Sequence, residues 1–227
     1  MKYAEFQKQI KITRKSICKE FYKQNQDSIR IKKEETVIRN LEKIFNAALK
    51  ISNAKGFQAM SMRDLSNEMG LSTGALYAYF SSKEDLLNKM QEHRHNIVMH
   101  IIDKYISPEK NAYQKLDMMI KVHLYLSEAM QPWFYFSYME TKNMSKSQRE
   151  KTVAASFAIE KVITDIIKQG QEKRCFNKHD PDMSASIIKA MLQDWYLKRK
   201  KYATRNISVD DYAEFIKMVI MAFLNNP

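Results

Sequence analysis

Residues 56–87 read GFQAMSMRDLSNEMGLSTGALYAYFSSKEDLL, and they contain three of the four glycines in the 227-residue chain. These are Gly56, Gly70 and Gly74. Glycine suits positions where the backbone turns sharply or is closely approached by another group. Here it punctuates short helical patterns, which is typical of a helix-turn-helix.

The residues around these glycines predict the first two helices of the motif. From Thr36 to Ala54 apolar residues recur every three or four positions, which predicts a helix with one buried face that Gly56 ends. Ser61 and Asp64 have the spacing of a capping box, and they predict the start of a second, short helix. Gly70 is expected to end that helix.

A third helix is expected over residues 73–80, with Ser72 as its N-cap. Leu76 and Phe80 are four residues apart and should face inward, which leaves Thr73, Gly74 and Tyr77 on the outer face. In a helix-turn-helix the second helix lies in the major groove of DNA and presents its N-terminal residues to base edges. The pattern therefore predicts DNA binding.

The run from Leu76 to Leu87 resembles the DNA-binding domain of the TetR family of transcriptional regulators, and the resemblance extends over residues 37–95. It implies that Tyr77 contacts a phosphate or a base, and that the small Gly74 permits close approach. It also implies phosphate contacts from Ser61 at the start of the second helix and from Lys83 at the start of the fourth. From its spacing, Arg63 is placed for a further phosphate contact. Tyr79 stands where the family frequently has a histidine. The expected DNA-binding residues are Ser61, Arg63, Ser72, Thr73, Gly74, Tyr77, Tyr79 and Lys83.

The net charge of +12 is unevenly distributed, with +7 in residues 1–33, zero in residues 34–95 and +5 in residues 96–227. We expect these ranges to be a basic N-terminal extension, the DNA-binding domain, and a helical ligand-binding and dimerisation domain. Three readings of the extension remain open: an amphipathic helix docked on the body or lying along DNA, a solvated and partly disordered tail, or a helix on a membrane surface. We expect it to strengthen DNA binding without setting sequence.

The resemblance implies that the last two helices pair with their copies in a second chain. A two-fold dimer of this kind would read a palindromic operator, with one half-site per chain. The apolar stripes concerned would also suit an ordinary core. The expected interface residues are Ile187, Met191, Trp195, Phe215, Val219 and Phe223.

Residues 118–139 are rich in methionine and aromatic side chains, which suit adaptable apolar pockets. Similar proteins bind a small molecule in this region and then release DNA. Each such residue could equally belong to the core of a helical domain. For a bulky, largely apolar effector, the expected contacts are Met119, His123, Trp133, Phe134, Tyr138 and Phe157.

Several other classes of protein receive no support from the sequence. No phosphate-binding glycine loop, nucleophile elbow or thiol pair occurs, and the histidines lack the usual spacing of zinc ligands. We therefore expect no enzyme, cofactor or metal. Without an apolar run long enough to span a membrane, and with only two lone cysteines, a cytoplasmic location is expected. The expectation is an all-α, homodimeric regulator, most simply a ligand-relieved repressor. The alternative is a similar dimer that activates transcription, or acts through a protein partner, without a small-molecule switch.

Overall fold

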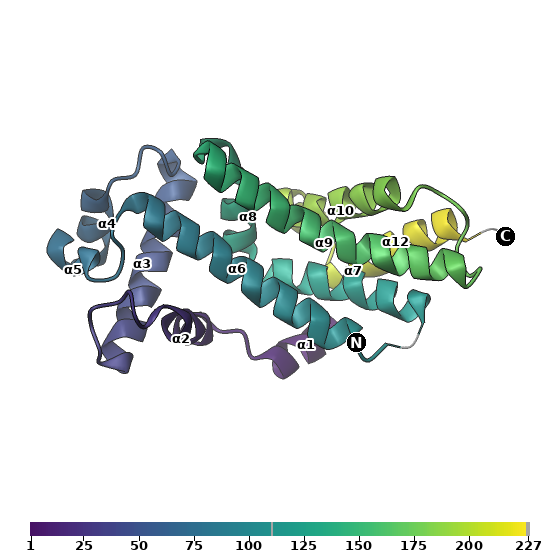
Figure 1. The fold of residues 1–227 in the computed structure, drawn as a ribbon, viewed down its shortest axis with the longest axis horizontal. Coiled ribbons are helices and arrows are strands. Elements are labelled where there is room, and N and C mark those ends of the chain that lie inside the picture. Colours follow the sequence, from purple (N-terminus) through teal and green to yellow (C-terminus); the bar gives the residue numbers. More distant parts are fainter. Residues whose placement is uncertain (110, 226–227) are drawn as a thin grey trace. The chain divides into compact units, whose positions relative to one another are not determined.

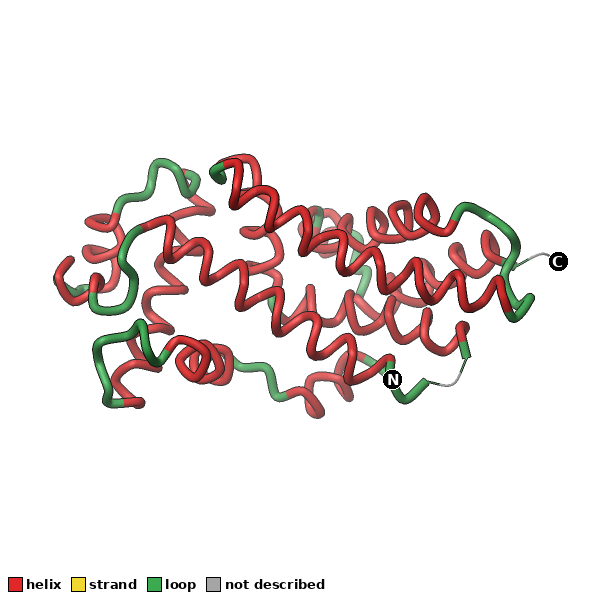
Figure 2. The backbone as a smooth tube through the Cα atoms, viewed as in Figure 1, coloured by secondary structure: helices red, strands yellow, loops and turns green. Residues whose placement is uncertain are grey.

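The computed structural model describes residues 1–109 and 111–225, and within them it contains twelve α-helices, one short 3₁₀-helix and no strand (Figures 1 and 2). The all-α fold expected from the sequence is confirmed. No helix in these residues is long and apolar enough to cross a membrane. The helices are α1 (Tyr3–Ile10), α2 (Arg14–Asn25), α3 (Glu34–Lys55), α4 (Met62–Met69), α5 (Thr73–Tyr77), α6 (Lys83–Ile106), α7 (Ala112–Ala129), α8 (Gln131–Glu140), α9 (Lys146–Glu172), α10 (Pro181–Leu197), α11 (Arg199–Thr204) and α12 (Val209–Leu224).

The chain divides into two compact units. The N-terminal unit consists of Gln7–Arg94 and Phe136–Arg149. The C-terminal unit consists of Met1–Phe6, His95–Tyr135 and Glu150–Pro227. Helices α1, α6, α8 and α9 each contribute residues to both units.

The core of the N-terminal unit is built around α3, which packs against α2 on one side and α4 on another. Phe45 of α3 lies edge-on to Phe21 of α2, with ring centroids 5.0 Å apart, and both side chains are buried. Leu41, Leu65 and other apolar side chains complete this core. The α2 helix itself starts at a capping box in which Thr13 is the N-cap.

Residues 3–25 thus form two helices with buried apolar faces rather than a solvated tail. Phe6 and Phe21 are each 0% exposed, so these rings are not available to a membrane surface. Phe6 lies in the C-terminal unit, with its centroid 5.5 Å from those of Tyr105 and Tyr125. Of the alternatives left open by the sequence, the docked amphipathic helix agrees with this packing.

The C-terminal unit has α7 at its centre, packed against α10 and α12. Buried Tyr125 of α7 donates a hydrogen bond to Asp210 of α12 at 2.5 Å, and Asp210 also accepts from the backbone amide of Tyr3 at 3.0 Å. The buried ammonium of Lys121 lies 3.1 Å from Asp117 and 3.0 Å from Glu214. These polar contacts satisfy groups that would otherwise be costly to bury.

Candidate nucleic-acid interface

The candidate interface is formed by α4, α5 and the turn between them. Gly70 ends α4 with φ 65°, in the left-handed region that favours glycine, and its amide donates to the Asn67 carbonyl. Ser72 then caps α5, because its hydroxyl accepts from the amide of Ala75 at 3.1 Å. The hydroxyls of Ser66 and Thr73 lie 3.1 Å apart and join the two helices. Local capping chemistry and one polar contact therefore fix the orientation of α5.

The outer face of α5 is open. Leu76 and Phe80 are buried, as the sequence predicts, whereas Ser72 and Gly74 are exposed and Thr73 is half-buried. Tyr77 is 47% exposed, which is a large fraction for an aromatic side chain. A Cβ atom added to Gly74 would meet no protein atom within 4 Å. Packing within the chain therefore does not require glycine here, and the open space is available to an approaching partner.

Two of the expected DNA-binding residues, Ser61 and Arg63, lie at the start of α4. The Ser61 hydroxyl accepts from the Asp64 amide at 3.1 Å and donates to the Asp64 carboxylate at 2.8 Å. The hydroxyl and the backbone amide of Ser61 both donate to the Asp64 carboxylate at 2.8 Å, and together with Lys55 at 3.0 Å they lower the pKa of Asp64 to about 2. Arg63, in the first turn of the same helix, is exposed. Ser61 is thus first a helix cap, whereas Arg63 projects its charge into solvent.

Lys83 begins α6 and is half-buried. Its ammonium donates to the carbonyls of Gln58 at 3.0 Å and Phe57 at 3.4 Å, and it lies 5.3 Å from the centroid of the Phe57 ring. An ammonium has three donors. One N–H therefore remains for a phosphate without breaking these two contacts.

Tyr79 is a correction to the sequence-based expectation that it contacts DNA. It is 1% exposed, and its hydroxyl accepts from the Asn40 side-chain amide at 2.8 Å. Helix α5 ends at Tyr77 rather than Phe80, because Ala78 and Tyr79 donate to the carbonyls three residues earlier. In such a tight turn, residues three apart share a face, so Tyr79 follows buried Leu76 into the core.

The residues expected to bind an effector differ in burial and in the unit to which they belong. Met119, His123, Trp133 and Phe134 are buried in the C-terminal unit, where the rings of His123 and Phe134 meet edge-on at 5.7 Å. Tyr138 is 48% exposed and belongs to the N-terminal unit. Phe157 is 60% exposed on α9. Helical periodicity identified apolar residues here, but it could not tell which of them would converge.

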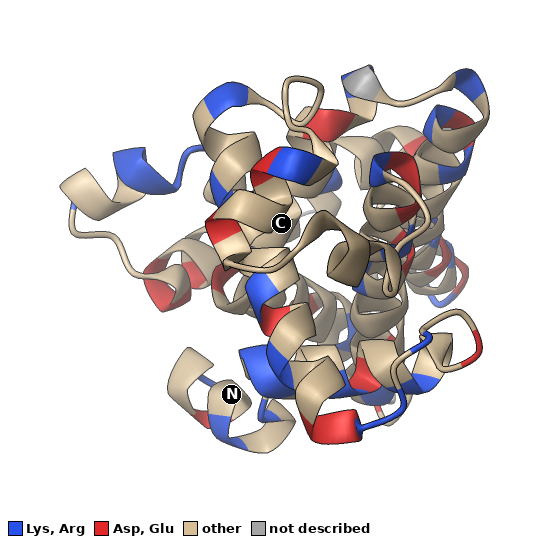
Figure 3. Ribbon diagram, turned by 90° about the vertical axis from the view of Figure 1, so that its left-hand side faces the viewer, with Lys and Arg blue, Asp and Glu red and all other residues tan. Residues whose placement is uncertain are grey.

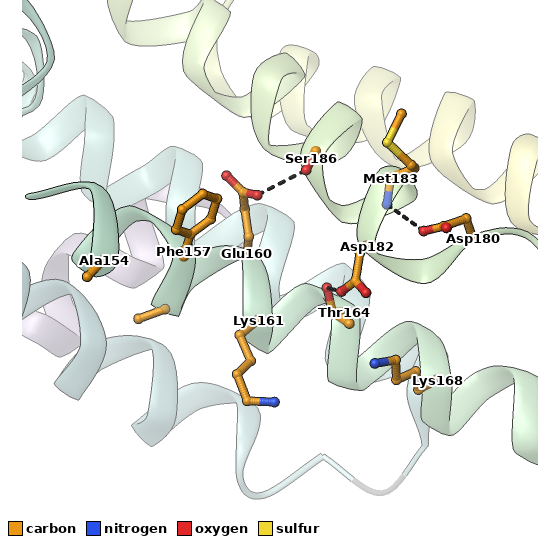
Figure 4. A pocket seen from close by; sticks show the side chains of 11 residues that line it. Ala154, Phe157, Glu160, Lys161, Thr164, Lys168, Asp180, Asp182, Met183 and Ser186 are labelled. Atoms are coloured by element: carbon orange, nitrogen blue, oxygen red, sulfur yellow. Dashed lines mark hydrogen bonds between the residues drawn. The ribbon is translucent and has the colours of Figure 1, made fainter. Parts of the chain in front are cut away.

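Phe157 instead borders an open groove of about 870 Å³ between α9 and α10 (Figure 4). The groove has apolar side chains, such as Phe157 and Met183, beside charged ones. Two hydrogen bonds connect its walls: Ser186 donates to Glu160 at 3.0 Å, and Thr164 donates to Asp182 at 3.0 Å. Its lining residues are Ala154, Phe157, Ala158, Glu160, Lys161, Thr164, Lys168, Asp180, Asp182, Met183 and Ser186.

The residues expected at a dimer interface fall into two groups. Ile187 on α10 and Phe215, Val219 and Phe223 on α12 are between 38% and 58% exposed, and these two helices pack together. Met183 and Met218 add to the same helices with 64% and 58% exposure. Sequence reasoning missed both, although Met183 lies one helical turn before Ile187. We call the six side chains Met183, Ile187, Phe215, Met218, Val219 and Phe223 the apolar face.

Met191 and Trp195 do not share that exposure. Met191 is half-buried, and Trp195 is 0% exposed, which corrects its expected place at an interface. The Trp195 indole N–H donates to Glu128 at 3.0 Å, and its ring stacks on Tyr202 with centroids 5.1 Å apart. Trp195 is therefore a core residue of the C-terminal unit.

Two family models match the chain and together cover more than half of it. The model for bacterial regulatory proteins of the tetR family matches residues 44–90, and the tetracyclin repressor-like C-terminal domain matches residues 109–198. Helices α4 and α5 lie within the first range and α10 within the second, whereas α12 follows it. In the described residues, no cluster of three His, Cys, Asp or Glu side chains could hold a metal ion.

Two curated relatives come from Bacillus subtilis (strain 168). The HTH-type transcriptional regulator YvdT is 29% identical over 90 residues, which are 38% of this chain but only 45% of that protein. The match thus spans less than half the length of this relative. The fatty acid metabolism regulator protein is 20% identical over 164 residues, which are 70% of this chain and 84% of the relative.

Solved structures share the fold. A tetR-family regulatory protein from Rhodococcus RHA1 has a TM-score of 0.74 at 19% identity, covering 82% of this chain and 96% of that one. The regulator FadR from Bacillus subtilis, in complex with stearoyl-CoA, has a TM-score of 0.65 at 15% identity, covering 81% and 98%. With both domain models matched in order and this fold in place, the chain belongs to the TetR family of transcriptional regulators.

Proposed function

We propose that the chain is a homodimeric repressor that binds a palindromic operator through α5 and leaves it when a small, largely apolar molecule binds the C-terminal unit. The observation that carries DNA binding is the open face of α5, where exposed Gly74 and Tyr77 stand beside Ser72 and Thr73. A recognition helix must approach the major groove closely and present polar side chains that can hydrogen-bond to base edges. Such a regulator would act in the cytoplasm, on the chromosome.

Within this proposal, phosphate contacts set the position of α5 and base contacts choose the sequence. Arg63 and the remaining N–H of Lys83 are suited to phosphates, because both charges lie at or near the surface. Ser61 and Ser72 both cap helices. The Ser72 hydroxyl only accepts in its cap and can still donate to a phosphate, whereas the Ser61 hydroxyl would have to leave the Asp64 carboxylate to do so. Thr73, Gly74 and Tyr77 would read bases.

The two-fold arrangement is supported by the apolar face on α10 and α12. Six large apolar side chains exposed on two adjacent helices are unusual for a monomer, since such patches normally mark an interaction site. In a two-fold dimer the apolar face of one copy would pack against the apolar face of the other, because such an interface uses the same patch on both subunits. Met191 would contribute at its edge.

The effector part of the proposal draws on the methionine and aromatic side chains of α7 and α8, and on the stearoyl-CoA bound by FadR. Flexible methionines can reshape around a long apolar ligand. Met119, His123, Trp133 and Phe134 would line such a site, while Phe157 borders the separate α9–α10 groove. Tyr138, which is exposed in the N-terminal unit, is left out of this site.

The decisive experiment is fluorescence anisotropy on DNA from immediately upstream of the gene, compared with unrelated duplex. Wild-type protein should prefer the upstream DNA, and Tyr77→Ala should abolish this preference. Tyr113→Ala is the matched control, because Tyr113 is also an exposed tyrosine but lies on α7. Equal binding of both duplexes by wild-type protein would reject sequence-specific recognition at this site.

The same assay tests the switch. Stearoyl-CoA and palmitate should raise the melting temperature and release the operator, whereas choline serves as a small cationic comparison. Release by an acyl compound supports the repressor mechanism. If none of these compounds shifts the melting temperature or DNA affinity, the apolar-effector proposal fails, and a dimer acting through a protein partner becomes the better reading.

A further inference from the structure

The loop between α2 and α3 lies outside the matched family domain, and a hydrogen bond fixes it next to α5, the helix proposed to enter the major groove. The backbone amide of Arg30 donates to the carbonyl of Ala78 at 3.0 Å, directly after the last residue of α5. This hydrogen bond involves only main-chain atoms of Arg30. Its guanidinium therefore remains exposed to solvent at the C-terminal end of α5.

Several contacts hold this loop in one conformation. Ile29 is 0% exposed, and the Lys32 ammonium donates to the carbonyls of Gln26 at 3.1 Å and Ile29 at 3.2 Å. The ammonium of Lys89 on α6 donates to the Ser28 hydroxyl at 3.1 Å. Lys32 thus serves the loop itself, while Arg30 is presented by a pre-ordered segment. Little conformational entropy of the backbone would be lost on binding.

A second exposed arginine lies near the same end of α5. Arg39 on α3 precedes Asn40, whose amide donates to the buried Tyr79 hydroxyl at 2.8 Å. The positive charge of Arg39 also partly offsets the desolvation that raises the pKa of Tyr79. Acidic residues occur on the same elements, but Glu34 is paired with Lys19 at 3.5 Å. Figure 3, which views the molecule from the left of Figure 1, shows Lys and Arg interspersed with Asp and Glu. A phosphate contact here would therefore depend on these two arginines and not on a uniformly basic face.

The dimensions of DNA indicate what these arginines can reach. A helix of five residues, such as α5, is about 7.5 Å long, because each residue adds about 1.5 Å. The major groove is about 12 Å wide and is walled by phosphates. Groups placed just beyond the end of α5 therefore face a groove wall rather than base edges. The planar, permanently charged guanidinium is well suited to phosphate.

We propose that Arg30 and Arg39 form an additional phosphate-binding surface, which the N-terminal extension and α3 supply beside the C-terminal end of α5. The inference rests on the proposed DNA binding by α5. The surface adds affinity for any duplex and carries no base specificity of its own. It is distinct from Ser61, Arg63 and Lys83, which belong to the starts of α4 and α6.

Salt dependence tests this surface directly. Anisotropy of wild-type protein, Arg30→Gln, Arg39→Gln and the double variant is measured over a salt series on upstream and unrelated DNA. Removing one arginine–phosphate interaction should reduce the slope of log affinity against log salt by about 0.9. A two-fold dimer has two copies of each arginine, so each single variant should reduce the slope by about 1.8. Both duplexes should weaken by the same factor.

Two further variants distinguish position from total charge. Arg205→Gln removes one exposed arginine from the C-terminal unit and should leave the slope unchanged. Arg30→Lys keeps a positive charge and should retain most of the slope. Unchanged melting temperatures would show that the fold is intact.

The surface would be rejected by a wild-type slope in the double variant, by an equal reduction of the slope in Arg205→Gln, or by weakening on upstream DNA alone. These results differ from failure of the proposed function. If wild-type protein does not prefer upstream DNA, the slopes on unrelated duplex still show whether Arg30 and Arg39 contact phosphate.

Discussion

The Nε2–H of His93 donates to the carbonyl of Ile17 at 2.9 Å, so a buried imidazole joins α6 to α2. The ring also meets Phe21 edge-on, with centroids 5.3 Å apart, and Nδ1 lies 3.0 Å from the Gln24 side-chain oxygen, Oε1. Because the tetR-family match begins at residue 44, α2 is an addition to the matched domain. It is nevertheless part of the core of the N-terminal unit.

We expect the stability of this unit to fall at mildly acidic pH. Burial lowers the pKa of His93 from 6.5 to about 4, although the Ile17 carbonyl and Glu20 partly oppose the shift. The unfolded state therefore binds more protons than the folded state between these values. Stability is complete above about pH 6.5 and declines as pH falls towards 4, by up to about 3 kcal/mol.

Urea unfolding at pH 7.5 and pH 5 measures this effect, with His93→Gln as the test variant. The substitution should lower stability at neutral pH and remove much of its pH dependence. His100→Gln is the control, since His100 is exposed on the same helix. A pH profile that is identical in His93→Gln and wild-type protein would show that another group is responsible.

Phe21→Ala should destabilise the protein by about 3–5 kcal/mol, because the ring is 0% exposed and a cavity would remain. Lys15→Ala, an exposed change on the same helix, should alter stability by less than about 0.5 kcal/mol. Thermal or urea unfolding compares the two. A small effect of Phe21→Ala would mean that α2 detaches readily.

The expected destabilisation also means that deleting residues 1–32 would damage the fold, so charge variants are better probes of DNA binding.

Local chemistry explains which features were predictable from the sequence. The capping box of Ser61, the left-handed Gly70 and the Ser72 cap each depend on residues within one turn of a helix. Their signatures are short and specific, and the structure has all three. The open face of α5 follows from the same local reasoning, because Leu76 and Phe80 mark its buried side.

Features that depend on distant contacts were less predictable. Tyr79 and Trp195 lie at helical spacings that suit a surface stripe, but contacts with Asn40 and Glu128 place their polar atoms against the core. An aromatic residue with one polar atom can satisfy either environment. The burial of Phe6 and the position of Arg30 likewise require partners far away in sequence, which one sequence without packing information cannot identify.

Gly74→Ala should weaken DNA binding without loss of stability. A Cβ atom at this position meets nothing in the chain, and alanine is the better helix former, so stability should stay equal or rise by up to about 1 kcal/mol. Gly70→Ala should instead lower the stability and leave DNA binding by the folded protein unchanged, because φ 65° costs a non-glycine residue about 1–2 kcal/mol. Melting curves and operator anisotropy together measure both. Full operator affinity in Gly74→Ala would mean that DNA does not approach α5 closely there.

Ile187→Glu and Phe215→Glu should each shift the proposed two-fold dimer to monomer, at concentrations where wild-type protein is expected to be dimeric. Burying either apolar side chain contributes about 1.5–3 kcal/mol, and each 1.4 kcal/mol is a tenfold change in dissociation constant. An unpaired carboxylate in the interface adds a further penalty. Sedimentation equilibrium measures the constant, with Met139→Glu as a control, because Met139 is exposed in the N-terminal unit. Since one chain offers one reading helix, monomeric variants should also lose their preference for a palindrome. Dimers of wild-type strength in both variants would assign the apolar face to some other partner.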